Sequence, residues 1–122
     1  VISMRQGILI AAVIIGLSGC STDLDENPLP LLIGAEPSAK SRNDLGIDHY
    51  KAGRFLEALL QFNQANFADP TSGEIHFNLG LAYLQEGKKK KARKNFNLAK
   101  KLARGNTRIL KSKILNIILS EN

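Results

Sequence analysis

The sequence repeats itself as LGIDHYKAGRFLEALLQFNQA at residues 45–65 and as LGLAYLQEGKKKKARKNFNLA at residues 79–99. A shift of 34 residues superimposes seven identities between the two stretches. They are Leu45 on Leu79, Gly46 on Gly80, Gly53 on Gly87, Ala58 on Ala92, Phe62 on Phe96, Asn63 on Asn97 and Ala65 on Ala99. An internal period of this length indicates an array in which each repeat is one supersecondary unit.

The residue types inside the repeat indicate paired helices. Glycine and alanine let the two helices of a hairpin approach closely, and Phe62 and Phe96 fill the space between hairpins. Gly53 and Gly87 each stand where the chain must turn back. We therefore expect an all-α fold with a core of aliphatic residues and a few phenylalanines, since only 6% of the residues are aromatic and none is tryptophan.

Breaks in the pattern set the expected helix bounds. Asp69-Pro70 separates the two hairpins, and Thr71 with Glu74 matches a capping box at the next helix start. Gly105 is expected as the C-cap of the fourth helix. The sequence predicts helices at about residues 40–52, 55–68, 72–86, 89–104 and 107–119.

The period and its key residues resemble the tetratricopeptide repeat (TPR) family. The first copy covers about residues 39–72 and the second about 73–106. Arg42 and His76 stand where the family has its first aromatic residue, and Arg104 replaces the closing proline that Pro70 supplies in the first copy. The resemblance implies antiparallel helix hairpins, two repeats and a C-terminal capping helix, within a TPR domain at residues 38–122.

The amino end is typical of an export signal. A short positive segment, Met4-Arg5-Gln6, precedes an apolar stretch at residues 8–17 that is too short to span a bilayer of roughly 30 Å. The stretch ends in Leu17-Ser18-Gly19-Cys20, which resembles the bacterial lipobox. We expect a signal peptide at residues 1–19 and an acylated Cys20; the alternative is an incidental cysteine in an ordinary signal peptide. By resemblance to lipoprotein sorting, Ser21 favours the outer membrane.

Residues 20–37 are predicted to be a flexible tether. Acidic side chains and three prolines disfavour a continuous helix there. In an extended form at about 3.1 Å per residue, the segment would reach roughly 50 Å from the lipid. The apolar patch Leu29-Pro30-Leu31-Leu32-Ile33 is unusual for a linker, and docking on the domain is the alternative.

The TPR resemblance implies a concave groove, lined by the first helix of each repeat, that binds a protein segment. The alternative for Leu81 and Leu84 is a place in the core. The groove has no basic constellation of the kind with which some TPR domains clamp a C-terminal carboxylate. The expected lining residues are Asn43, Ile47, Tyr50, Lys51, Phe77, Asn78, Leu81, Leu84 and Gln85.

Charge is distributed unevenly. Residues 20–87 hold four basic and ten acidic side chains, whereas residues 88–122 hold twelve basic and one acidic. The alternatives for the basic surface are a solvated face, contact with anionic lipid headgroups and contact with an acidic protein. Nucleic acid is not an expected partner of an exported chain. The predicted basic stripe on the fourth helix consists of Lys90, Arg93, Lys94, Lys101 and Arg104.

The fifth helix is more apolar than a capping helix requires. Its apolar side chains cover more than half of the circumference at 100° per residue, leaving a narrow polar strip. The alternatives for the excess apolar surface are burial under the Leu29–Ile33 patch and a surface for self-association or a partner. The apolar residues are Ile109, Leu110, Ile114, Leu115, Ile117, Ile118 and Leu119.

Enzymatic chemistry finds little support in the sequence. His49 and His76 stand at repeat positions usually given to packing aromatics, which favours packing over a metal or base role. A single cysteine excludes an internal disulfide, and no Cys/His spacing resembles a zinc site. We expect no catalytic residue, metal or cofactor.

In size and layout the chain is similar to the small assembly lipoproteins of tight-adherence (Flp) and type IV pili. This resemblance implies a membrane-anchored adaptor on the periplasmic side, with an outer-membrane secretin or a pilus component as partner. The alternative is a general envelope scaffold that recruits cell-wall or outer-membrane assembly factors. An enzyme accessory or a hydrolase is a distant third.

Overall fold

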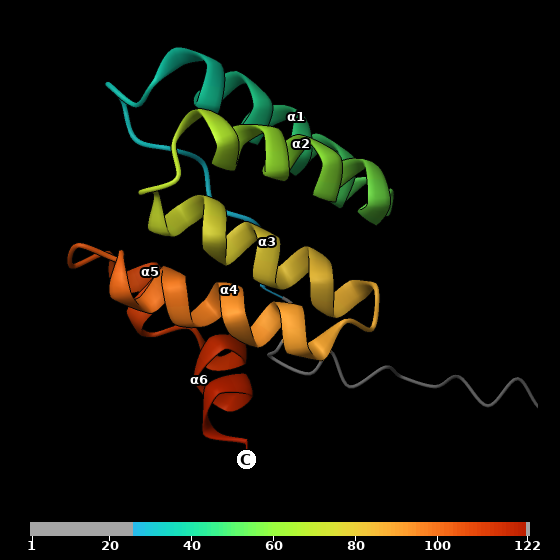
Figure 1. The fold of residues 1–122 in the computed structure, drawn as a ribbon, viewed down its shortest axis with the longest axis vertical. Coiled ribbons are helices and arrows are strands. Elements are labelled where there is room, and N and C mark those ends of the chain that lie inside the picture. The colour runs from blue at the N-terminus through green and yellow to red at the C-terminus, as the bar shows by residue number, and fades with distance from the viewer. Residues whose placement is uncertain (1–25, 122) are drawn as a thin grey trace, which may run out of the picture.

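The computed structural model describes residues 26–121, and the secondary structure of this part of the chain consists of helices without strands (Figure 1). The all-α class is therefore confirmed. The predicted signal peptide and Cys20 lie outside the described residues. The helices are α1 Pro37–Lys51, α2 Phe55–Ala68, α3 Gly73–Gln85, α4 Lys89–Lys101, α5 Thr107–Leu110 and α6 Lys113–Ser120.

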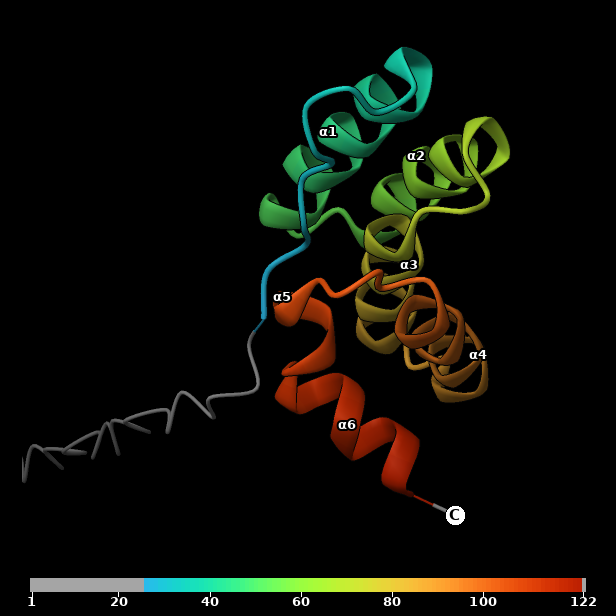
Figure 2. The same ribbon diagram turned by 90° about the vertical axis from the view of Figure 1, so that its left-hand side faces the viewer.

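The first four helices form two stacked antiparallel hairpins, α1 with α2 and α3 with α4 (Figure 1). Viewed from the side, α1 and α3 lie toward one face of the stack and α2 and α4 toward the other (Figure 2). α5 and α6 follow α4 and cover the end of the second hairpin. None of the described helices combines the length and apolarity that crossing a membrane requires.

Two phenylalanines and two glycines bring the helices of each hairpin together. Phe62 and Phe96 are completely buried. A Cβ atom at Gly46 would lie 2.4 Å from Cε1 of Phe62, and one at Gly80 would lie 2.5 Å from Cδ1 of Phe96. Because real Cβ atoms do not approach a ring so closely, only glycine fits at these two positions. The seven repeated identities thus include both halves of the closest contact in each hairpin.

The turns inside the hairpins need glycine for a different reason. Gly53 and Gly87 have φ angles of +74° and +70°, in the left-handed region that favours glycine. Their amides donate to the carbonyls of Tyr50 and Leu84 at 3.0 and 2.9 Å. The predicted turns are therefore correctly placed, and α2 has the predicted bounds.

The capping prediction at the start of α3 is wrong by one residue. The cap is Ser72, whose Oγ accepts the Ile75 amide at 3.2 Å, and Glu74 instead accepts from the Ser72 hydroxyl. The amide and the hydroxyl of Thr71 both donate hydrogen bonds to Oδ1 of Asp69 instead. That turn leaves Ser72 as the last residue before the helix.

The C-terminal region also differs from its prediction. α4 ends at Lys101 with Leu102 as its C-cap, so the C-cap predicted at Gly105 is wrong. Arg104 and Gly105 follow in a turn, with φ angles of +47° and +79°. The expected helix at residues 107–119 is two helices, since Ser112 is buried and its Oγ accepts the Leu115 amide at 3.1 Å. This side-chain cap starts α6 anew, where the apolar pattern alone indicates continuity.

Candidate protein-binding surfaces

The predicted concave face is assembled from α1 and α3, and most of its residues are more buried than an open groove would leave them. Six are buried, Leu84 is half-buried, and Lys51 and Gln85 are exposed. Gln85 Nε2 donates to the Tyr50 hydroxyl at 3.3 Å and links the two helices. The buried six are Asn43, Ile47, Tyr50, Phe77, Asn78 and Leu81.

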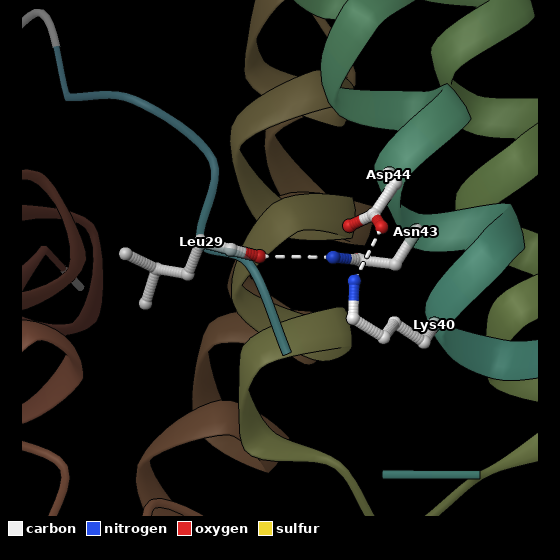
Figure 3. A network of polar contacts seen from close by, with 4 residues as sticks. All are labelled: Leu29, Lys40, Asn43 and Asp44. Carbon is white, nitrogen blue, oxygen red and sulfur yellow. Dashed lines mark hydrogen bonds and ion pairs between the residues drawn. The ribbon is translucent and has the colours of Figure 1, made fainter. Parts of the chain in front are cut away.

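The chain's own N-terminal segment occupies the middle of this face. Leu29 is 4% exposed, and its amide donates to Oδ1 of Asn78 at 2.6 Å. Its carbonyl accepts from Nδ2 of Asn78 at 2.8 Å and from Nδ2 of Asn43 at 3.0 Å. Figure 3 shows the Leu29 carbonyl pointing at the Asn43 carboxamide, beside the exposed Lys40–Asp44 ion pair on α1.

The two asparagines form a small hydrogen-bond network around the backbone of Leu29. Asn78 Nδ2 also donates to Oδ1 of Asn43 at 2.8 Å, and both side chains are completely buried. The hydrogen bonds of both asparagines with Leu29 are to its backbone amide and carbonyl, whereas its side chain packs in the hydrophobic core. The part of the face that stays accessible lies toward Lys51 and Gln85.

The segment continues onto the C-terminal helices. Oε1 of Glu26 accepts the Ile114 amide at 3.1 Å, close to the start of α6. Leu31 is buried as well, whereas Leu32 and Ile33 are exposed at the turn before α1. From residue 26 on, the predicted tether is therefore packed against the domain, as the docking alternative requires.

The residues of the predicted basic stripe come together on the surface of α4. Four of them, Lys90, Arg93, Lys94 and Lys101, line one shallow depression, and Arg104 follows the helix in the left-handed turn. Lys89 forms an ion pair with Glu121, and Nη2 of Arg93 lies 3.9 Å from the same carboxylate. Exposed pairs of this kind contribute only about 0–1 kcal/mol, so the stripe remains mainly a solvent-facing positive surface.

The two histidines take part in packing and local hydrogen bonding. His76 is 6% exposed, and its ring nitrogens lie 3.2 Å from Asn95 Oδ1 and 3.1 Å from the Pro70 carbonyl. Nδ1 of His49 accepts from Nε of Arg54 at 3.0 Å. Within residues 26–121, no group of three or more His, Cys, Asp or Glu side chains is arranged to hold a metal ion.

The C-terminal helices bury part of their apolar surface. Ile109, Leu115 and Ile118 are in the core, whereas Leu110 and Ile117 are 39% and 41% exposed. Two half-exposed side chains are a small patch, and self-association through this region stays a prediction.

Stacked helix hairpins with a repeat of 34 residues define a helical-repeat protein of the class that binds other proteins. The profile of the tetratricopeptide repeat family matches residues 43–107, and the chain belongs to this family. It is also similar to the type IV pilus assembly protein PilF of Pseudomonas aeruginosa, with 27% identity over 105 residues. The match covers 86% of this chain and 42% of PilF, so the chain spans less than half of that relative's length.

Proposed function

We propose that this chain is a lipid-anchored adaptor of the cell envelope that binds a protein partner during assembly of a pilus or secretion complex. The fold and family support protein binding rather than catalysis. The similarity to a protein named for type IV pilus assembly supports the choice of pathway. The accessible end of the concave face, around Lys51 and Gln85, is the part of the α1–α3 surface that a partner reaches without displacing residues 26–31.

The anchor in this proposal is Cys20, and the packed segment changes its expected reach. With Glu26 fixed beside α6, only five residues separate it from Cys20. Such a length spans at most about 20 Å, not the roughly 50 Å of a free tether. The adaptor would therefore work close to the membrane, with the side that carries Glu26 toward the lipid.

Replacing Cys20 with serine tests the anchor. Cys20→Ser is expected to abolish incorporation of labelled palmitate and to move the protein from the membrane fraction to the soluble fraction. Acyl chains stabilise membrane binding by about 0.8 kcal/mol per buried CH₂. The sequence has one cysteine, so the variant has no thiol that could be acylated in its place. Ser21→Ala is the matched control and should leave labelling intact. An unlabelled wild type, together with a variant that still sediments with membranes, would refute the anchor.

A further inference from the structure

The outer face of α2 carries an apolar stripe that the concave-face function does not use. Leu56, Leu60 and Phe67 are 60%, 56% and 92% exposed. At 100° per residue they lie opposite the helix face that buries Ala58 and Phe62. Leu60 and Phe67 also line a depression of about 440 Å³ between α1 and α2. Large apolar side chains gathered on one solvent-facing stripe indicate an interaction surface.

The same positions of the second repeat are basic. The shift of 34 residues places Leu56, Leu60 and Phe67 on Lys90, Lys94 and Lys101, while the intervening Asn63 and Asn97 are identical. All three lysines are exposed, and within residues 26–121 no carboxylate pairs with them. α2 and α4 lie toward the same face of the stack (Figure 2). One face of the domain thus presents three apolar side chains on α2 and three lysines at the equivalent positions of α4.

We propose that this α2–α4 face binds an acidic amphipathic helix of a partner protein. The three apolar residues and the three lysines each span 12 residues, about 16 Å along the helix, which suits a ligand helix of three to four turns. The ligand would lay leucine-type side chains on α2 and point carboxylates at the lysines of α4, as in other helix-in-groove complexes. The chain itself provides a precedent, because Glu121 at the end of α6 already approaches Lys89 and Arg93 on α4.

The position of Glu26 favours a protein, rather than a lipid surface, as the partner of the α2–α4 face. Glu26 lies beside α5 and α6, and in the side view the first described residues are on the side opposite α2 and α4 (Figure 2). With Cys20 within about 20 Å of Glu26, an anchored chain turns the α2–α4 face away from its own membrane. Only this choice between partners depends on the proposed anchor; the surface itself does not.

The test uses the soluble chain from residue 20 onward, carrying Cys20→Ser, and a fluorescent 18-residue helical peptide. The peptide has leucines on one stripe and glutamates on the adjacent stripe. Fluorescence anisotropy is expected to show saturable binding, weakened about tenfold by Phe67→Ser and at least as much by Lys90→Gln/Lys94→Gln/Lys101→Gln. The matched control, Arg108→Gln/Lys111→Gln/Lys113→Gln, removes three exposed charges elsewhere and should bind as the wild type does.

Two further probes separate the alternatives. A peptide with lysine in place of glutamate should not bind, and phosphatidylglycerol vesicles at physiological salt should not retain the protein. The proposal is overturned if the glutamate peptide fails to bind, if both stripe variants bind it normally, or if the vesicles retain the wild type and lose the lysine variant. The purified components contain neither lipid anchor nor pilus protein, so a negative result leaves the adaptor function standing.

Discussion

Phe96→Ala is expected to lower the free energy of unfolding by about 3–5 kcal/mol. The ring is completely buried between α3 and α4, directly over Gly80, and its centroid lies 5.8 Å from that of Phe77. Truncation removes one of the two fully buried phenylalanines of the second hairpin, and Gly80 opposite has no side chain that could move into the cavity. Since a two-repeat array has few interfaces, a loss of this size takes most of the stability of a small domain. Urea denaturation followed by circular dichroism measures the change.

Phe67→Ala is the matched control, because it makes the same truncation at a side chain that is 92% exposed. We expect its unfolding free energy to stay within about 0.5 kcal/mol of the wild type. Equal denaturation midpoints for Phe96→Ala and the wild type would be incompatible with the packing described for the hairpins.

Asn78→Ala is expected to destabilise the protein by about 2–4 kcal/mol and to release residues 26–31 from the concave face. The substitution removes both hydrogen bonds of Asn78 with Leu29 and leaves the buried Asn43 carboxamide without one partner. Each buried polar group left unsatisfied costs about 1–3 kcal/mol. Hydrogen exchange at the Leu29 amide, measured by NMR, should be far faster than in the wild type, because that amide loses its acceptor.

Asn63→Ala serves as the control for this substitution. Asn63 is exposed and donates only to the carbonyl of Leu59 on its own helix. Its replacement should leave Leu29 exchange unchanged and alter stability by no more than about 0.5 kcal/mol. Slow exchange at Leu29 in Asn78→Ala would show that the asparagine network does not hold the segment.

The repeat core could be predicted from the sequence, because its determinants are local and appear twice. Gly46 with Phe62 and Gly80 with Phe96 are complementary pairs at one spacing, and their coincidence indicates both the helices and their contact. The break between α5 and α6 could not be predicted from apolar periodicity, since Ser112 caps the second helix through a side-chain bond that periodicity does not register.

The N-terminal segment shows a different limit. Its prolines and acidic residues indicate a tether, yet Leu29 is fixed by Asn78, 49 residues away in the sequence. Such a contact depends on the tertiary arrangement of α1 and α3. The apolar cluster around Leu29 indicates docking only as an alternative to the predicted tether, and it does not identify the asparagines that bind the segment. The apolar stripe of α2 is not among the surfaces predicted from the sequence. The shift of 34 residues that pairs the cores also pairs Phe67 with Lys101, and this contrast in residue type was a signal for it.

The proposed function requires that the anchored chain bind a component of a pilus or secretion complex. The most direct measurement is chemical crosslinking in intact cells that express the tagged full-length protein, followed by purification and quantitative mass spectrometry against an untagged strain. Our account predicts enrichment of a pilus or secretion component, such as an outer-membrane secretin, that falls when Cys20→Ser displaces the chain from the membrane. Enrichment of cell-wall enzymes or outer-membrane assembly factors alone, or of no envelope protein, would contradict it.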